Sequence, residues 1–198
     1  MRTIYIVIAA AIWLTCAANT QKQARKGLKT TEVLRHESPQ ADLVKRGEYL
    51  VTIMGCADCH SPKKLGPQGP VPDMERFLSG FDSAQPLGAY DKNVVKTGQW
   101  VIFNAQNTAF AGPWGVSFAA NLTPDDTGIG TWTFEQFNLA MRKGKFKGIQ
   151  ANRPLLPPMP WQNYTKMSSA DMKAIFVYLK SLKPVPNVVP AHLPPGQI

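Results

Sequence analysis

The chain has 198 residues, of which 44% are hydrophobic, so it is long enough for one domain with extensions and too apolar to be disordered throughout. It carries 22 lysine and arginine residues against 13 aspartate and glutamate residues, a formal net charge of +9. The basic residues form no cluster interleaved with aromatic residues, which argues against a nucleic-acid partner and favours an acidic protein partner.

Residues 1–18 have the pattern of an export signal peptide. Arg2 provides the positive charge, and an apolar stretch follows from Ile4 to Leu14. This stretch is shorter than the about 20 apolar residues that a membrane-spanning helix needs, although an uncleaved N-terminal anchor is an alternative. We therefore expect a periplasmic or other extracytoplasmic location.

Cys16 gives this segment a second interpretation, a lipoprotein signal that ends before Cys16. The preceding residues Trp13 and Thr15 match the lipoprotein pattern poorly, so a lipid anchor at Cys16 and a cleaved product without an anchor both stay open. Such an anchor would be the chain's one link to a membrane. In either case Cys56 and Cys59 are the two cysteines left for the folded part, too few and too close together for a disulfide framework.

The segment before the folded domain, residues 19–40, is polar and lysine-rich and is expected to be a flexible tether. The domain itself is expected over residues 41–186. Its first predicted helix covers residues 41–54, because apolar or small residues recur there with helical spacing. These residues are Leu43, Gly47, Leu50 and Met54.

Two more helices are predicted in the second half of the chain. One begins after Thr131, is capped by Thr133 and runs to about Lys143, before Gly144. The other begins at Ser168 or Ser169 and runs to Leu182. The segment 184–198 contains five prolines, so residues 187–198 are expected to be an extended Pro-rich tail.

The segment 61–130 is rich in glycine, proline and asparagine and is expected to form long loops, with a short strand at 100–103. A compact domain keeps so much loop only when something fixes it, and a large buried cofactor would do so. With three helices and no strongly alternating strand, the sequence predicts an all-α fold.

Residues 56–60 form the sequence Cys-Ala-Asp-Cys-His, which is the haem-attachment pattern. Two thiols separated by two residues can both form thioethers with the vinyl groups at one edge of a porphyrin. The following His60 then lies under the iron and donates a ring nitrogen. The sequence therefore predicts one covalently bound haem c, held by Cys56 and Cys59 and ligated by His60.

Three other uses of the two cysteines are less compatible with their surroundings. A redox-active pair of the thioredoxin kind needs a helix that starts at the first cysteine, whereas here the predicted helix ends before it. A zinc site needs further ligands, and His36 and His192 both lie in predicted tails. A disulfide across so short a loop is sterically poor.

The sixth iron ligand is predicted to be Met159. Methionine or a second histidine commonly fills this position. The candidates are Met54, Met74, Met141, Met159, Met167, Met172, His36 and His192. Met159 differs from the others because three prolines surround it in the segment 157–161, and they would hold its thioether at low entropic cost.

The surroundings of the predicted haem are less well defined by the sequence. His60 should donate its other ring N–H to a backbone carbonyl, and the loop 66–72 is suitably placed to provide it. Four aromatic residues either wall the haem or belong to the ordinary core: Trp114, Phe118, Trp161 and Tyr164.

Three segments together resemble class I c-type cytochromes. Residues 47–50, before the attachment motif, resemble the first helix of that fold, in which Gly47 would allow close crossing by an aromatic residue such as Phe176 or Tyr178. Residues 121–133 and 156–161 resemble the monohaem domains in the cytochrome c subunits of membrane-bound alcohol and gluconate dehydrogenases. This resemblance extends over about residues 42–186.

The resemblance implies a cytochrome c fold with long loops around one haem, and His60 and Met159 as axial ligands. A haem with both axial positions filled offers no position to a substrate, so we expect a one-electron carrier and not an enzyme. Its donor and acceptor would be redox proteins. Two alternatives stay open, a bound subunit of a dehydrogenase or oxidase complex, and a peroxidase-like enzyme from which Met159 is displaced.

Overall fold

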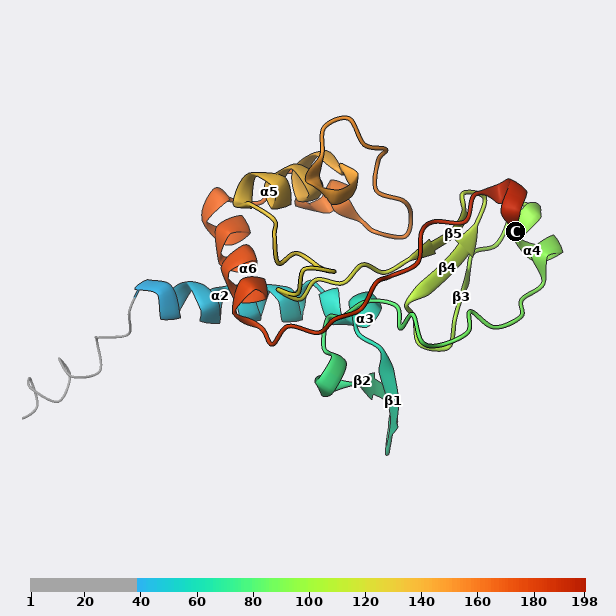
Figure 1. Ribbon diagram of the computed structural model, residues 1–198, viewed down its shortest axis with the longest axis horizontal. Coiled ribbons are helices and arrows are strands. Elements are labelled where there is room, and N and C mark those ends of the chain that lie inside the picture. Colours follow the sequence, from blue (N-terminus) through green and yellow to red (C-terminus); the bar gives the residue numbers. More distant parts are fainter. Residues whose placement is uncertain (1–38) are drawn as a thin grey trace, which may run out of the picture. The chain divides into compact units, whose positions relative to one another are not determined.

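The computed structural model describes residues 39–198 (Figure 1). The predicted export signal, Cys16, His36 and most of the predicted tether lie outside the described residues. The chain divides after Asp42 into two units. The first unit contributes only the beginning of helix α2 (Pro39–Ile53) to the described part, and all other described elements belong to the second unit, residues 43–198.

The three predicted helices are all present, with small changes at their ends. Helix α2 begins two residues before the predicted start and ends one residue earlier. Helix α5 spans Phe134–Lys143, where Thr133 and Gln136 form a reciprocal capping box and Gly144 ends the helix in the left-handed conformation. Helix α6 spans Ser169–Ser181, with the side chain of Ser168 accepting a hydrogen bond from the Asp171 amide.

Helices α2 and α6 cross in contact at Gly47. A Cβ atom on Gly47 would lie 2.1 Å from the carbonyl oxygen of Ala174 and 2.6 Å from Cβ of Tyr178, so no larger residue fits. Arg46 and Asp171 add an ion pair across the same crossing, with a Nε–Oδ1 distance of 2.8 Å. The prediction that an aromatic residue such as Phe176 or Tyr178 crosses closely at Gly47 is therefore confirmed for Tyr178.

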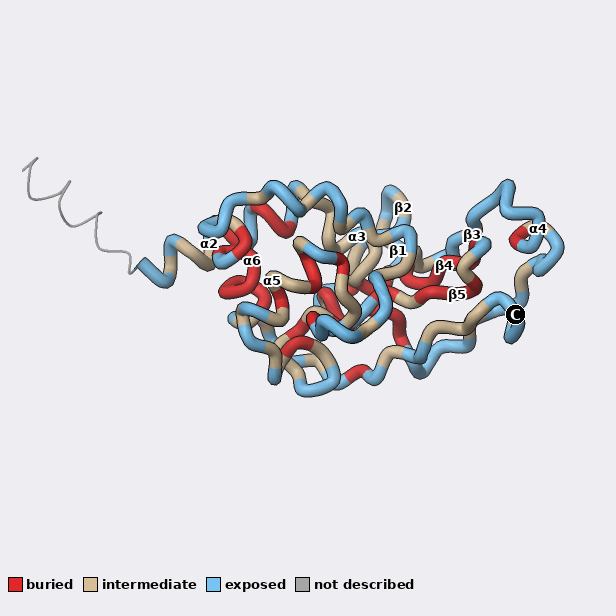
Figure 2. The backbone as a smooth tube through the Cα atoms, turned by 90° about the horizontal axis from the view of Figure 1, so that it is seen from above, coloured by how far each residue is buried: buried red, intermediate tan, exposed pale blue. Residues whose placement is uncertain are grey.

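Helix α5 packs against α6 through aromatic rings. Phe134 and Phe137 lie with ring centroids 5.8 and 5.4 Å from that of Phe176. Figure 2 shows buried residues along α6 and along strands β4 (Ala109–Gly112) and β5 (Gly115–Phe118). The main core is built from α2, α5, α6 and two loop residues, namely Leu50, Val51, Leu78, Ile129, Phe137, Met141, Met172, Ile175, Phe176, Tyr178 and Leu179.

The segment expected to be long loops contains two small antiparallel sheets, so the all-α expectation holds for the helical part alone. Strands β1 (Lys63–Gly66) and β2 (Gly69–Pro72) form a hairpin. Strands β3 (Ile102–Phe103), β4 (Ala109–Gly112) and β5 (Gly115–Phe118) form the second sheet, in that order. The expected strand at 100–103 is confirmed in its second half.

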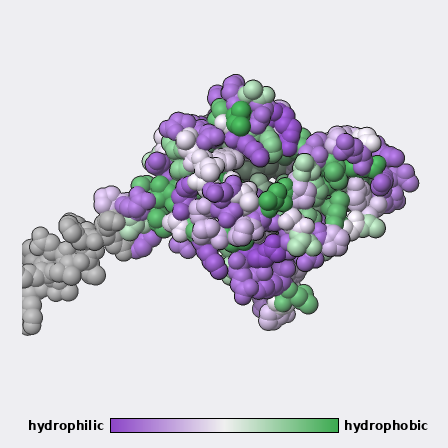
Figure 3. Space-filling model, viewed as in Figure 1, coloured by the Kyte–Doolittle hydropathy of each residue, from purple (hydrophilic) through white to green (hydrophobic). Residues whose placement is uncertain are grey.

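These strands were missed because their sequences lack a period-two pattern. All four residues of β4 are buried, so its two faces do not alternate between apolar and polar side chains. The β1–β2 hairpin instead faces solvent, with Leu65 90% exposed, and it projects at the lower edge of Figure 3 with a partly hydrophobic tip.

Short helical segments connect these elements. Helix α3 (Cys56–His60) follows α2, and helix α4 (Lys92–Lys96) precedes the second sheet. Four 3-10 turns complete the described structure: η1 (Met74–Arg76), η2 (Phe146–Gly148), η3 (Trp161–Tyr164) and η4 (Pro195–Gln197). Across residues 39–198, none of the helices combines the length and the hydropathy that a bilayer crossing requires.

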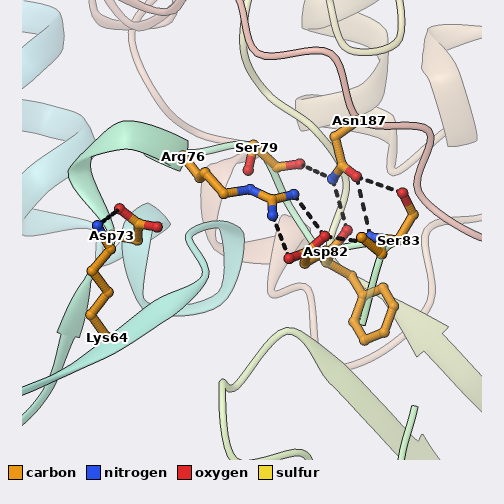
Figure 4. A network of polar contacts seen from close by, with 9 residues as sticks. Lys64, Asp73, Arg76, Ser79, Asp82, Ser83 and Asn187 are labelled. Atoms are coloured by element: carbon orange, nitrogen blue, oxygen red, sulfur yellow. Dashed lines mark hydrogen bonds and ion pairs between the residues drawn. The ribbon is translucent and has the colours of Figure 1, made fainter. Parts of the chain in front are cut away.

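The Pro-rich tail, residues 187–198, is mostly extended but lies against the domain. Leu193 exchanges two backbone hydrogen bonds with Val116 of β5, at 2.8 and 3.0 Å. The buried side chain of Asn187 donates to the carbonyl oxygens of Ser79 and Phe81, both at 2.7 Å, and accepts from the hydroxyl of Ser83 (Figure 4). These contacts attach the tail both to strand β5 and to the loop of residues 79–83.

Candidate haem-binding site

The attachment motif coincides with a short helix of its own. Helix α2 ends at Ile53, Gly55 turns the chain with a φ of 66°, and α3 then begins at Cys56 and ends at His60. The expectation that no helix starts at the first cysteine is therefore wrong, so the position of the helix does not exclude a redox-active cysteine pair. The turn at Gly55 requires glycine for its left-handed backbone.

Another property of the cysteines contradicts the redox interpretation. Both are half-buried free thiols, and burial raises the pKa of Cys56 to about 11 and raises that of Cys59 as well. A reactive redox cysteine needs a lowered pKa, because the thiolate is the nucleophile. The zinc alternative also lacks support, since residues 39–198 contain no group of three or more potential histidine, cysteine or carboxylate ligands.

His60 is held by one ring nitrogen and keeps the other available. Its Nδ1 atom lies 2.7 Å from the carbonyl oxygen of Ala120, which can only accept, so Nδ1 carries the proton and Nε2 has a free lone pair. Burial lowers the pKa of His60, which favours this neutral form. The partner is a backbone carbonyl as expected, but the expected segment 66–72 forms the β1–β2 turn instead.

The backbone next to His60 is fixed from the loop that contains Leu78. The Gly80 amide donates to the His60 carbonyl at 2.7 Å, and the Leu78 amide donates to the Ser61 hydroxyl at 2.9 Å. Leu78 is fully buried with a φ of 59°, an unusual conformation for a branched residue. Since Asn187 holds the carbonyls of Ser79 and Phe81, the tail supports His60 through this loop (Figure 4).

The predicted methionine ligand and the attachment motif belong to one apolar cluster. Cys56, Ala57, Met159 and Tyr164 are all partly buried and pack against the main core. Burial raises the pKa of Tyr164, and the nearby thiols of Cys56 and Cys59 raise it further. The tyrosine therefore lies close to both cysteines, and its turn η3 begins two residues after Met159.

Met54 and Met167 share this cluster with Met159, whereas the other methionine and aromatic candidates lie elsewhere. Met141 and Met172 are buried in the main core, while Met74 is 71% exposed. The aromatic residues Trp114 and Phe118 lie in the second sheet, where Phe118 packs on Phe81 with ring centroids 4.9 Å apart.

The donor set suits a covalently attached haem. It combines two half-buried thiols, an imidazole with a free Nε2 atom and a thioether, and two of these groups, Cys56 and Met159, pack against the main apolar core. Porphyrin requires such an apolar surface, and sulfur and imidazole are the usual axial donors to its iron. The residues present therefore fit this cofactor.

Asn107 is a neighbour of the motif that the sequence analysis did not identify. It lies in the β3–β4 turn with a φ of 54°, and its Nδ2 atom donates to the Asp58 carbonyl at 2.9 Å and lies 3.8 Å from Sγ of Cys59. Its Oδ1 atom is buried with no protein partner. Only the fold brings this turn to the motif, about 50 residues away in sequence.

The methionine loop makes a contact with the second sheet that was also not predicted. The Ser117 hydroxyl donates to the Pro157 carbonyl at 2.7 Å and accepts from Nε1 of Trp114 at 3.1 Å. Within the loop, the Met159 amide donates to Leu156 at 3.3 Å. No sequence signal distinguished Ser117 from other serines.

Comparison with known proteins agrees with this geometry. A 90-residue segment is 39% identical to a subunit of the nicotinate dehydrogenase of Pseudomonas putida, covering 45% of this chain and 7% of that protein. The chain is also similar to the gluconate 2-dehydrogenase cytochrome c subunit of Pantoea cypripedii, at 31% identity over 69% of this chain and 22% of that protein. The fructose dehydrogenase cytochrome subunit of Gluconobacter japonicus is 29% identical over 72% of this chain and 22% of that protein.

The chain thus spans less than a quarter of the length of these curated relatives. The family described as Cytochrome c matches residues 44–183, most of the described part. This segment contains the attachment motif, His60 and the Met159 loop. The chain therefore belongs to the cytochrome c family of electron-transfer proteins.

Proposed function

We propose that the chain carries single electrons through one haem c, attached at Cys56 and Cys59 and ligated axially by His60 and Met159. The observation that supports this best is the common apolar cluster of Cys56, Met159 and Tyr164 next to a histidine whose Nδ1 atom is already engaged. When bound, the haem supplies a one-electron redox couple.

The residues around the proposed haem each have a defined role. The Ala120 carbonyl orients His60 and increases the basicity of its free Nε2 atom. Tyr164 and the core residues exclude water from the thioether side, which keeps reorganisation on electron gain and loss small. If His60 and Met159 both ligate the haem iron, as proposed, they would leave no coordination position for a substrate, so catalysis on a bound molecule is not expected.

The partners are proposed from charge and similarity. A net charge of +9 favours acidic donor and acceptor proteins, through weak and short-lived complexes. The names of the similar gluconate and fructose dehydrogenase subunits favour a dehydrogenase as one of them, either as a free partner or in a complex. We further propose an extracytoplasmic location, with or without a lipid anchor at Cys16.

The test is the optical spectrum of the haem-loaded protein for wild type, Met159→Ala and the control Met74→Ala, whose side chain is 71% exposed. We expect a weak band near about 695 nm, typical of ferric iron bound to methionine, in the wild type and the control but not in Met159→Ala. A high-spin wild type without the band would show an open sixth position and favour the enzyme alternative. A band that survives in Met159→Ala would assign the ligand to another methionine.

A further inference from the structure

We propose that Ser117 is a positioning residue for Met159, and that the segment 117–120 connects the two axial ligands through the second sheet. This inference rests on the proposed haem ligation. It assigns a role to the sheet part of the domain, which the sequence analysis treated as loop.

The first observation is the orientation of the Ser117 hydroxyl. Ser117 is 8% exposed, and its Oγ atom accepts from Nε1 of Trp114 at 3.1 Å while it donates to the Pro157 carbonyl at 2.7 Å. A hydroxyl has one proton, and the indole N–H can only donate, so this arrangement has one direction. The proton of Ser117 is committed to Pro157, two residues before Met159.

The second observation is that the same segment also holds the other ligand. Ala120, three residues after Ser117, provides the carbonyl that accepts from His60 Nδ1 at 2.7 Å. The backbone between them is fixed on both sides, because the Ala119 amide donates to Thr108 and the Ala119 carbonyl accepts from Phe81, both at 2.9 Å. The segment 117–120 therefore accepts a hydrogen bond from His60 and donates one to the loop that contains Met159.

The third observation concerns what else holds the methionine loop. In the described part of the chain, the other hydrogen bonds of residues 156–160 run to neighbours within the loop or to η3. The Ser117–Pro157 hydrogen bond therefore joins the described residues 156–160 to strand β5, which is distant in sequence. Pro157 itself is exposed, so this bond joins a surface residue of the loop to the buried Ser117.

The functional consequence lies in how often the iron–methionine bond opens. Without the Ser117 hydroxyl, the Pro157 carbonyl would exchange its protein partner for water, and the loop would move away from the haem more readily. An external ligand such as imidazole enters only while Met159 is away from the iron. Its binding rate therefore measures the opening of the loop directly.

The experiment compares imidazole binding to the oxidised, haem-loaded wild type with Ser117→Ala and a matched control, Ser181→Ala. The Ser181 hydroxyl also donates to a backbone carbonyl at 2.7 Å, that of Tyr178, but this bond lies within α6. Stopped-flow loss of the band near about 695 nm reports methionine displacement. We expect Ser117→Ala to bind imidazole about three- to tenfold faster, the effect of one lost hydrogen bond, and the control to stay within about twofold of wild type.

A second variant covers the case in which Ser117→Ala does not accumulate as holoprotein. Trp114→Phe removes the N–H donor that directs the Ser117 hydroxyl. Its proton would then bond to Pro157 for less of the time, and we expect an increase of about two- to threefold.

Equal rates for Ser117→Ala and wild type, or an equal increase in the Ser181 control, would overturn the inference while leaving the ligation intact. Absence of the band in the wild type would instead overturn the proposed ligation itself. The two failures are therefore distinguishable in the same set of spectra.

Discussion

The helical part and the sheet part of the domain are stabilised in different ways. The helical core contains eleven buried residues, with large aliphatic and aromatic side chains, whereas the core of the second sheet contains three, Val95, Ala111 and Val116. The sheet part is attached to other segments mainly by hydrogen bonds, through the side chains of Asn107 and Ser117 and through the backbone of Val116, which pairs with Leu193 of the tail. Apolar burial thus forms the frame of the cytochrome, while hydrogen bonds attach the sheet to it.

The largest expected effect comes from breaking the helical frame at its closest contact. Gly47→Ala places a methyl group 2.1 Å from the Ala174 carbonyl oxygen, so α2 and α6 must separate. We expect a loss of at least about 3 kcal/mol in the free energy of unfolding, measured by denaturant titration of the holoprotein. The control is Gly196→Ala, because a Cβ there meets nothing within 4 Å. Equal stability of the two variants would mean that the helices do not cross in contact.

A smaller effect is expected when the polar attachment of the tail is removed. Asn187→Ala leaves the buried carbonyls of Ser79 and Phe81 without their donor, which should lower the free energy of unfolding by about 2–4 kcal/mol. Asn93→Ala, at an exposed position of α4, is the matched control.

Hydrogen exchange sharpens this prediction. The Gly80 and Leu78 amides, which contact His60 and Ser61, should lose protection in Asn187→Ala before the amides of α6 do. If α6 lost protection to the same extent, the tail would be stabilising the helical frame as well, and the contrast between the two parts would be wrong.

The smallest effect distinguishes two ion pairs, Arg76–Asp82 in the loop after the β1–β2 hairpin and Arg46–Asp171 in the helical part. Burial alone would raise the pKa of Asp82, but hydrogen bonds from Arg76 and from the Ala84 amide, with the charge of Arg76, outweigh it and hold the pKa below its ordinary value. Because the folded pKa is depressed, this stabilisation is present above the ordinary aspartate pKa near about 4 and is lost as the pH falls below it.

Asp82→Asn should therefore remove part of the acid-dependent loss of stability, by about 1–2 kcal/mol between neutral pH and pH about 3. The Arg46–Asp171 pair, in the helical part, is more exposed, with side chains 51% and 28% accessible, so Asp171→Asn should have the smaller effect. Denaturant titrations of the three proteins at both pH values provide the measurement. A larger effect at Asp171 would contradict this order.

The sequence was sufficient for the helices because their signals are local. The capping box at Thr133 and Gln136, the stop at Gly144 and the cap at Ser168 each depend on residues within one turn. Strand β4 lacks such a signal, because burial on both faces removes the alternating pattern. The prediction of the hydrogen-bond partner of His60 failed for a related reason. Ala120 contributes only its backbone carbonyl, and because every residue has one, no residue type marks the partner in the sequence.

The sequence by itself determined the family, the attachment motif, the candidate ligand His60 and the three helices, because each is encoded in residue types at short spacing. The tertiary structure decided which carbonyl orients His60, which turn contacts Cys59 and which serine contacts the Met159 loop. These contacts join residues from 40 to 60 positions apart. Their partners are backbone atoms or common polar side chains, so only the folded chain selects among many equivalent choices.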